Sequence, residues 1–577
     1  MRATYFQRTA KLYLTSPEES SIRLMLVCQK LCHLDNFGPN RSVRNASSNK
    51  STTFNCNNPQ YLAIFWMDFF VLVTTSLAFI LLYGVARLTY SIWLKPKLQE
   101  RLLKQQGIRG RPYKLLVGDM KEFVRQITEA WSKPINLTHQ IVPRVDPFTL
   151  DNVQKYGKVS FCWAGTRPRL IIKDTELMKE VLANKQGHFQ KPPLNPIILI
   201  LSRGLTTLEG EQWSKRRRMI NPAFHLEKLK GMIPVFSVSC GQMIEQWKKM
   251  ASLQSSYEID VWPELQKLTA DAISRTAFGS SYEEGKKIFH LQKELISLTL
   301  EAMQSLYIPG FRFIPTKKNQ RRKKLDKDIT SMLRNVIQMK ENGMRTGQTR
   351  ADDLLGMLLQ HNNQCANGAE GGMTTEDVIE ECKQFYLAGQ ETTASWLTWA
   401  IIVLALHPEW QEKAREEVLQ VCGKEPDFEA ISHLKIVSIP LHEVLRLYPP
   451  VIALYQHANK DTKIKEISLP AGVDITLPIL LINHDPELWG DDAEEFKPER
   501  FSEGVSKASK DQLAFFPFGW GTRTSIGQNF AMLEAKVALA MILQHFSFKL
   551  SPSYSHAPYT VMTLQPQHGA QIILHQI

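Results

Sequence analysis

An uncharged apolar run near the start of the chain constrains the fold more than any other sequence feature. Phe69–Ala86 is 18 residues without a charged side chain, and Tyr61–Met67 extends the apolar run on its N-terminal side. As an α-helix the run would be about 27 Å long, which is close to the thickness of a bilayer core. A buried core helix is the alternative interpretation. Aromatic residues of the kind that anchor at membrane interfaces lie near the ends of the run: Trp66, Tyr83 and Tyr90. The sequence therefore predicts one membrane-spanning helix.

Basic residues dominate both flanks of this run. The first 60 residues carry eight Lys or Arg against three acids and are rich in Ser and Asn, which predicts a disordered extension, with a plastid transit peptide as the alternative. Seven more basic residues lie between positions 87 and 111, so the positive-inside rule places that side in the cytosol. We expect a basic extension at 1–60, a transmembrane anchor at 61–92, a basic linker with Gly and Pro at 93–112, and a globular domain at 113–577.

Composition narrows the class of the globular part. The 577 residues are 43% hydrophobic and 22% charged, which is typical of a folded protein, and the net charge of +13 favours an anionic membrane or an acidic partner. Neither zinc-finger spacing nor an aromatic RNA-binding signature is present, so no nucleic acid is expected. The eight cysteines form no CxxC pair, which indicates a reducing compartment. No cysteine follows Cys422.

Helical signals dominate the remainder of the chain. Thr374 provides N-cap chemistry for a helix of about 30 residues that ends at Leu406, and Pro408 suits the first turn of the next helix. Residues spaced for one face of that second helix are Trp410, Ala414 and Val418. Strand-like runs such as Leu170–Ile172 and Ile475–Leu477 are fewer. The predicted fold class is mainly α with a minor β part.

A shaped loop near the C-terminus carries the most specific chemical signal. Phe518–Gly527 combines aromatic residues and glycines and predicts an irregular loop. Apolar residues at helical spacing follow it: Phe530, Leu533, Val537, Ala540 and Phe546. Position 525 thus lies just upstream of a helix N-terminus, where backbone N–H groups favour an anion and would hold a cysteine as its thiolate.

This loop resembles the haem-binding loop of cytochromes P-450, F-x-x-G-x-R-x-C-x-G. Phe518, Gly521, Arg523 and Gly527 match its fixed positions, and Ser525 stands where the family has the cysteine that ligates iron. The resemblance covers roughly residues 100–577. It implies a cytochrome P-450 fold preceded by one transmembrane helix, with haem b (iron protoporphyrin IX) as cofactor. A serine hydroxyl is a weaker acid and a poorer ligand for haem iron, although serine favours helix N-caps and could keep the loop in shape.

Two further motifs match family positions for structure and for haem binding. The spacing of Glu443 and Arg446 places both on one helix face; a surface ion pair is the plain interpretation, and the resemblance implies a buried lock with Arg500. Trp213 and Arg217 are also spaced to reach one surface, and the resemblance implies that both contact a haem propionate. We expect the neighbouring basic residues to be solvated and available to an acidic redox partner: Lys215, Arg216 and Arg218.

A third motif lies inside the long helix. Glu391 and Thr392 follow Ala388-Gly389, and the plain interpretation is a solvated turn. The small pair can open space against the helix backbone, and a threonine hydroxyl can bond back to a carbonyl. The resemblance implies an oxygen-binding groove in which Thr392 steadies dioxygen and Glu391 relays protons.

The resemblance is strongest to the plant clan that includes secologanin synthase and the brassinosteroid, gibberellin and triterpenoid hydroxylases. It implies oxidation of a lipophilic small molecule, terpenoid or steroid-like, with O2 and electrons from NADPH through NADPH–cytochrome P-450 reductase. It also implies the endoplasmic reticulum membrane, with one span and a cytosolic catalytic domain. The alternative is a non-catalytic member of the same fold. Ser525 motivates that alternative, together with Gln456 in place of an arginine and Pro440 inside a helix.

Overall fold

The protein is described by a computed structural model that covers residues 42–43, 52–53, 59–185, 187–193, 195–251, 256–280, 282–303, 311–349, 351–366, 372–423 and 426–577. The chain divides into two units, Met1–Thr89 and Tyr90–Ile577. The predicted basic extension lies almost wholly outside the described residues. Within it, β1 (Ser42–Val43) pairs antiparallel with β2 (Thr52–Thr53).

The first unit contains the predicted apolar helix. This helix, α3, runs from Pro59 to Thr89, and the second unit opens with a π-helical segment (Tyr90–Leu94) and α4 (Lys95–Gln105). The stretch Trp66–Gln105 contains an 18-residue window of mean hydropathy 2.2 that is 0% buried, so its length and composition suit a membrane span. The segment predicted as a linker, 93–112, holds α4 and β3 (Arg109–Gly110).

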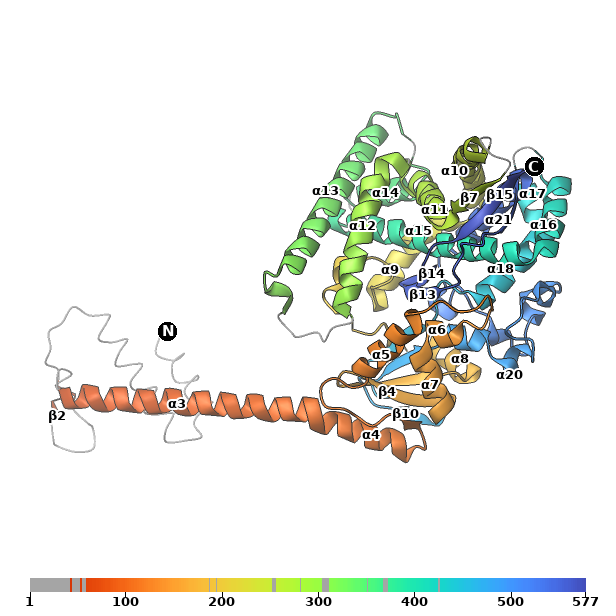
Figure 1. Cartoon of the computed structure of the whole chain (residues 1–577). Helices are drawn as coiled ribbons and strands as arrows, with labels where there is room; N and C mark the ends of the chain where they lie inside the picture. Colours follow the sequence, from red (N-terminus) through yellow and green to blue (C-terminus); the bar gives the residue numbers. More distant parts are fainter. Residues whose placement is uncertain are drawn as a thin grey trace. The chain divides into compact units, whose positions relative to one another are not determined.

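The predicted long helix runs through the second unit. This helix, α15 (Thr375–Leu406), packs against α11 (Val261–Phe278) and α21 (Gln528–His545), and α21 packs against α10 (Leu226–Ala251) (Figure 1). The predicted N-cap is confirmed: Thr374 Oγ1 accepts the Asp377 N–H at 3.1 Å, and Asp377 Oδ2 accepts the Thr374 N–H at 3.0 Å. This capping box supplies partners for backbone donors that the first turn leaves unpaired.

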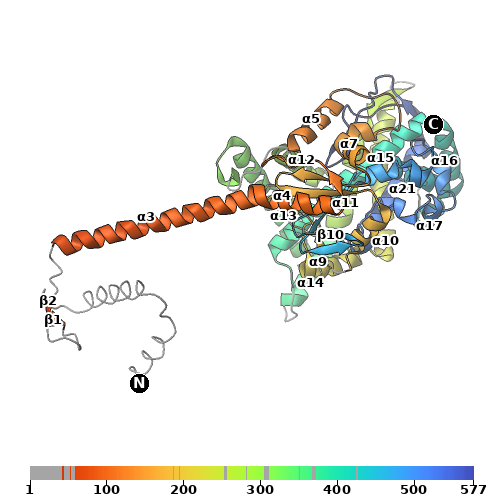
Figure 2. The same ribbon diagram turned by 90° about the horizontal axis from the view of Figure 1, so that it is seen from below.

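The second predicted helix, α16 (Pro408–Val421), begins with Pro408 in its first turn. Trp410, Ala414 and Val418 are all buried, as their spacing predicts. The helix packs against α21, and both views place α16, α17 (Phe428–His433) and α21 close together near the C-terminus (Figure 2). The fold class is therefore confirmed as mainly helical.

The second unit contains further helices. They are α5 (Met120–Trp131), α6 (Val142–Val145), α7 (Pro147–Tyr156), α8 (Thr175–Ala183), α9 (Gly210–Ile220), α12 (Tyr282–Met303), α13 (Lys317–Arg345), α14 (Leu354–Ala366), α18 (Lys435–Leu447), α19 (Ile479–Asn483) and α20 (Pro486–Trp489). Short 3-10 helices include η5 (Pro498–Phe501) and η8 (Gly521–Arg523).

The minor β part centres on a six-stranded sheet in the order β3-β4-β5-β11-β8-β6. Both predicted strands belong to it: β5 (Arg167–Ile172) and β11 (Asp474–Leu477) pair in parallel, with Ile475 opposite Leu170. The other members are β4 (Val159–Ala164), β6 (Phe189–Gln190) and β8 (Leu454–Ala458).

The second unit also contains smaller sheets. Strand β15 (Gln571–Gln576) lies between β12 (Phe546–Leu550) and β7 (Tyr257–Asp260), β13 (Pro558–Val561) forms a hairpin with β14 (Thr563–Pro566), and β9 (Thr462–Ile464) pairs with β10 (Ile467–Leu469). The sequence placed Phe546 on the apolar face of α21, and this is wrong. Phe546 begins β12, because α21 ends at His545.

Buried histidines give the domain a predictable response to acid. His139 Nδ1 lies 2.9 Å from the Tyr448 hydroxyl, and its ring stacks on His407. Burial lowers the pKa of His139 to about 3, of His484 to about 3 and of His556 to about 4. In the unfolded chain the same side chains titrate near their ordinary value of about 6.5. The folded state therefore binds fewer protons than the unfolded state between these limits.

We expect the free energy of unfolding to fall as the pH drops below about 6.5 and to keep falling until about pH 3–4. Each of the three histidines contributes about 1.4 kcal/mol per pH unit in that window, so going from pH 7.5 to 5.5 should cost about 4 kcal/mol. Urea unfolding at the two pH values measures the loss. His484→Gln should remove about one third of it, and an unchanged slope in that variant would contradict the assignment.

Candidate active site

Glycine backbone conformations set the shape of the loop Phe518–Gly527. Gly519 and Gly521 have φ values of +77° and +76°, in the left-handed region that favours glycine. A Cβ at Gly521 would lie 2.6 Å from the Leu182 carbonyl oxygen, so the close approach to α8 also requires glycine. The Ser525 N–H donates to the Phe518 carbonyl at 2.8 Å and closes the loop.

Ser525 lies in the exposed part of this loop. Its Oγ accepts the Gly527 N–H at 3.2 Å, which is a local serine turn. The helix α21 begins at Gln528 with Gly527 as its N-cap residue. The expectation that Ser525 suits the N-cap position is therefore wrong, because the N-cap residue, Gly527, lies two positions after it. Position 525 does lie just upstream of the α21 N-terminus, as predicted.

Three cationic side chains gather where the loop meets α9. The Arg523 guanidinium lies 4.2 Å from the centre of the Trp213 ring, donates to the Leu208 carbonyl at 3.0 Å and pairs with Glu209. Arg217 Nη1 donates to the Thr524 carbonyl at 2.9 Å. The third cation is Lys191.

Burial decides the electrostatics of this group, which we call the cation cluster (Lys191, Arg217 and Arg523). Burial lowers the pKa of all three side chains. The positive charge of Arg523 lowers the pKa of Lys191 further, and that of Arg217 lowers the pKa of Arg523. Glu209 is the acid that opposes these effects at Lys191 and Arg523. The cluster therefore has the charge to receive additional anionic groups.

Arg216 departs from the expectation that the neighbours of Arg217 are solvated. Its guanidinium pairs with Asp377 at 3.0 Å and with the fully buried Glu381 at 2.8 Å, so it ties α9 to α15. Lys215 and Arg218 are exposed, as expected. The sequence offered no signal for the Arg216 partner, because the pairing joins residues 165 positions apart.

Glu391 and Thr392 occupy one turn of α15. The Thr392 hydroxyl donates to the Ala388 carbonyl at 2.8 Å, which is the predicted bond back to the preceding turn. Gln565 Nε2 donates to Glu391 Oε2 at 3.1 Å, and Gln266 Nε2 lies 3.5 Å from Oε1. Burial raises the pKa of Glu391, while the charge of Lys293 opposes the rise. The turn therefore holds an acid that keeps its proton to a higher pH than an exposed glutamate does.

Gly389 has a different role from the one its spacing suggested. A Cβ at this position would lie 2.6 Å from Cγ1 of Ile273 on α11. The glycine therefore permits the close approach of α11 to α15, and the expectation that it opens free space is wrong.

Aromatic packing brings the loop to the same helix. The rings of Phe518 and Trp396 meet edge to face with their centres 6.2 Å apart. Trp396 lies four residues after Thr392, so both project from the same side of α15. Among the described residues, no hydrogen bond or ion pair joins Glu391 or Thr392 to the cation cluster.

Glu443, Arg446 and Arg500 come together where α18 packs against η5. Glu443 and Arg446 are fully buried on α18 and form two parallel hydrogen bonds of 2.7 and 2.8 Å. Arg500 Nε lies 3.5 Å from Glu443 Oε1. The closest acid to Arg500 is Asp492, at 2.6 Å, and the sequence did not identify it.

The structure also shows where Pro440 and Gln456 lie, the other two residues that depart from the family pattern. Pro440 lies inside α18 rather than at its start, so the helix lacks one backbone donor there. Gln456 is buried on β8, opposite Ile475 of β11.

Comparison with known proteins agrees with this architecture. The family model described as cytochrome P450 matches residues 138–574. Cytochrome P450 CYP72A616 of Paris polyphylla is 54% identical over 491 residues, which is 84% of this chain and 95% of the relative. The 11-oxo-beta-amyrin 30-oxidase of Glycyrrhiza uralensis is 51% identical over 515 residues, 88% of this chain and 98% of the relative.

Secologanin synthase 1 of Catharanthus roseus is 49% identical over 491 residues, 84% of this chain and 94% of the relative. The match of the family model, the relatives and the fold agree on one assignment. This chain belongs to the cytochrome P450 family of monooxygenase oxidoreductases, within the plant group that contains secologanin synthase.

Proposed function

We propose that this chain is built as a membrane-bound haem monooxygenase that oxidises a lipophilic small molecule, terpenoid or steroid-like, and that its turnover depends on residue 525. The observation that carries the proposal is the turn of α15 that holds Glu391 and Thr392, on the helix that packs against the loop Phe518–Gly527. The names of two relatives refer to oxidation of an amyrin derivative and to secologanin, which supports a terpenoid substrate.

The residues around the loop fit the carboxylates of haem b. Burial lowers the pKa values of the cation cluster, and Glu209 is the acid among the described residues that opposes this at Lys191 and Arg523, so two propionates would balance the remaining positive charge. We propose that Trp213, Arg217 and Arg523 hold the propionates, while Phe518, Gly521 and Gly527 shape the loop beside the macrocycle. At the position where the family has its iron-ligating cysteine, this chain departs from the pattern, because Ser525 would offer an alcohol oxygen to the iron.

When bound, haem supplies the iron that activates dioxygen for insertion into a substrate C–H bond. The chain supplies protons and their positions. Burial raises the pKa of Glu391, so its carboxyl keeps a proton to a higher pH than an exposed glutamate does, and it neighbours Thr392 in the sequence of α15. The Thr392 hydroxyl, fixed by its bond to the Ala388 carbonyl, keeps an oxygen lone pair that can accept a hydrogen bond. We propose that Glu391 delivers the proton and Thr392 orients the oxygen that receives it.

NADPH-dependent oxidation of terpenoids tests this proposal. The full chain with Ser525→Cys would be placed in a membrane with NADPH–cytochrome P-450 reductase, and product would be measured with and without NADPH and O2. We expect an oxygenated product that requires both. Thr392→Ala in the same background should yield less product per NADPH consumed. Equal product yield per NADPH in the two forms would contradict the role of Thr392.

We further propose that α3 anchors the protein in the endoplasmic reticulum membrane as a single span, with the catalytic domain in the cytosol. This gives residues 61–92 the role of anchor, residues 93–112 that of a connecting segment and residues 113–577 that of the haem domain. The exposed apolar side chains of α3 would otherwise face water, as Phe79 and Leu81 do with exposed fractions of 73% and 69%.

Deleting residues 1–92 is expected to move most of the protein from the microsomal to the soluble fraction. Deleting only residues 1–58 leaves α3 complete and should leave the protein in the membrane. Carbonate washing followed by centrifugation measures both. A 1–92 deletion that stays fully membrane-bound would show that another surface is the main anchor. Protease should digest the domain on sealed microsomes, and full protection would overturn the cytosolic orientation.

A second candidate function is a non-catalytic member that binds a ligand or a partner with the same fold. Ser525 favours it, because its Oγ accepts the Gly527 N–H and its own N–H donates to the Phe518 carbonyl, so both contacts hold the loop within the chain itself. On this interpretation the unaltered chain binds a ligand or a partner and forms no NADPH-dependent product, so product formation by the unaltered chain would overturn this second candidate.

A further inference from the structure

The hairpin of β13 and β14 is bonded to one side of α15. The hydroxyl of Ser395 and the indole N–H of Trp399 both donate to the Leu564 carbonyl, at 2.5 and 2.9 Å, and both side chains are fully buried. The next residue of β14, Gln565, donates from Nε2 to Glu391 Oε2 at 3.1 Å. Glu391, Ser395 and Trp399 are spaced four residues apart, so they lie along one side of the helix. The hairpin therefore contacts α15 over about two helical turns, with Glu391 at one end.

Bonds within the hairpin fix which end of the Gln565 amide faces Glu391. Its Nε2 also lies 3.1 Å from the Val561 carbonyl oxygen and 3.1 Å from Thr563 Oγ1. A carbonyl oxygen can only accept a hydrogen bond, so a flipped amide would place two acceptors against each other at Val561. The Gln565 side chain is also buried. The amide therefore offers Glu391 an N–H whose direction is set by its own hairpin.

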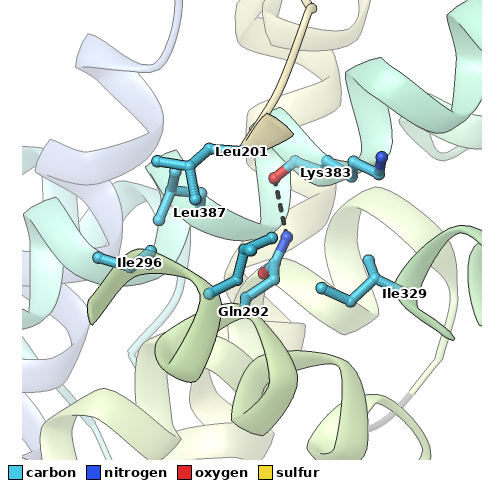
Figure 3. Close-up of a pocket in the computed structure, with 7 residues that line it drawn as sticks. Leu201, Gln292, Ile296, Ile329, Lys383 and Leu387 are labelled. Atoms are coloured by element: carbon cyan, nitrogen blue, oxygen red, sulfur yellow. Dashed lines mark hydrogen bonds between the residues drawn. The ribbon is translucent and has the colours of Figure 1, made fainter. Parts of the chain in front are cut away.

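The backbone of α15 is held by a different element on the N-terminal side of Glu391. Gln292 of α12 donates from Nε2 to the Lys383 carbonyl at 3.2 Å (Figure 3). Leu387, one turn before Glu391, lines a cavity of only about 10 Å³ beside this bond. Because the helix has little room to shift there, the contact with Gln565 acts on the direction of the Glu391 side chain rather than on the position of the helix.

Other titratable and polar groups also face Glu391. Burial raises the pKa of its carboxyl, and the charge of Lys293 on α12 and a hydrogen bond with Thr563 oppose the rise. Burial, and then the charge of Glu391, raise the pKa of Tyr559 on β13. On α11, Gln266 Nε2 lies 3.5 Å from Glu391 Oε1, so Gln565 makes the shorter contact of the two amides. Glu391 also lines a cavity of about 510 Å³ together with four other basic residues: Lys267, Lys286, Lys287 and His290.

We propose that Gln565 is a positioning residue that orients the carboxyl of Glu391 and keeps its acid proton on Oε1. The Gln565 N–H can only donate, so the oxygen that it contacts, Oε2, acts as the acceptor. The other oxygen, Oε1, then carries the proton that the carboxyl can give. The inference rests on the proposed function for its meaning, since it concerns the residue that would deliver the proton. The direction of the carboxyl is a property of the folded chain and does not require turnover.

Infrared spectra of the full-length protein in an ester-free detergent test the contact without turnover. The C=O band of the protonated carboxyl is assigned by its loss in Glu391→Gln. In Gln565→Leu we expect this band at higher frequency, because the C=O bond loses its hydrogen-bond donor. The ratio of ionised to protonated Glu391 at a fixed pH should fall about tenfold, since a hydrogen bond to a charged group is worth about that factor. An unchanged band or ratio in folded Gln565→Leu protein would overturn the proposal.

Two further variants separate this contact from a general disturbance of the fold. Gln565→Asn keeps the amide but withdraws it by one methylene, so we expect the same direction of change from a side chain that stays polar. The matched control is Gln571→Leu, in which the lost amide donates to the His568 carbonyl at 2.9 Å. A band in Gln565→Asn that matches the unaltered chain, or an equal shift in Gln571→Leu, would overturn the proposal.

The effect on the reaction is measured in the Ser525→Cys background. Gln565→Leu should lower the product formed per NADPH consumed, and the decline of this yield at high pH should move to higher pH. The sign follows because a proton donor acts while it is protonated, and loss of the Gln565 donor lets Glu391 keep its proton to a higher pH. An unchanged yield and pH profile would overturn the positioning role. Absence of NADPH-dependent product with Gln565 intact would count against the proposed function instead, so the two failures are distinct.

Discussion

Ser525→Cys is expected to give the protein the ferrous–CO absorption band for which the cytochrome P450 family is named, and the unaltered chain is expected to lack it. A thiolate donates electron density to iron and favours O–O cleavage, whereas an alcohol or water does so poorly. The site for a thiolate is otherwise present, because position 525 lies just upstream of the α21 N-terminus. NADPH-dependent product should rise at least about a hundredfold, which corresponds to about 2.7 kcal/mol of barrier.

A cysteine elsewhere in the loop provides the control. Thr522 is exposed three residues away, and Thr522→Cys should add a thiol without the band. A thiolate-type band in the unaltered chain would show that another group ligates the iron. Absence of the band in folded Ser525→Cys protein would place the defect elsewhere in the site, with Gln456 and Pro440 as the next positions to restore.

Glu443→Ala is expected to leave little folded protein. Glu443 is fully buried and accepts two hydrogen bonds from Arg446 and one from the Lys497 N–H, at 2.9 Å. Removing one partner of a buried pair strands the other charge, at a cost of about 3–5 kcal/mol. The free energy of unfolding of a protein is about 5–15 kcal/mol in total, so this loss is a large fraction of it. The yield of haem-loaded protein and the melting temperature measure the effect.

The exposed Glu499 in η5 supplies a matched control. Glu499→Ala should change the free energy of unfolding by less than about 0.5 kcal/mol. Asp492→Ala should fall between the two, because Asp492 is only partly buried and Arg500 keeps bonds to the Trp489 and Asp492 carbonyls. A Glu443→Ala protein with an unchanged melting temperature would show that the lock contributes nothing to folding.

Local patterns predicted the features that depend on near neighbours in sequence. The capping box at Thr374, the buried face of α16 and the strands β5 and β11 all follow from spacing within a few residues. Periodicity failed at Phe546, because an apolar residue at the correct spacing can equally begin a buried strand.

Local patterns could not predict contacts between residues that are far apart in the sequence. The pairing of Arg216 with Glu381 and the bond from Gln565 to Glu391 each join residues more than 150 positions apart. Gly389 was misread because its helix context suggested space, whereas its neighbour Ile273 comes from another helix. A single sequence contains the residues of such contacts but not their pairing.

The contacts that shape the loop Phe518–Gly527 have a consequence for how this protein can evolve. Gly519 and Gly521 shape the loop through their left-handed backbone angles, and Gly521 also approaches Leu182 closely. Arg523 donates to the Leu208 carbonyl. None of these contacts uses the side chain at 525. Serine and cysteine codons can differ by one base. An allele with either residue would therefore fold to the same loop, and selection would distinguish the alleles by chemistry rather than by protein abundance.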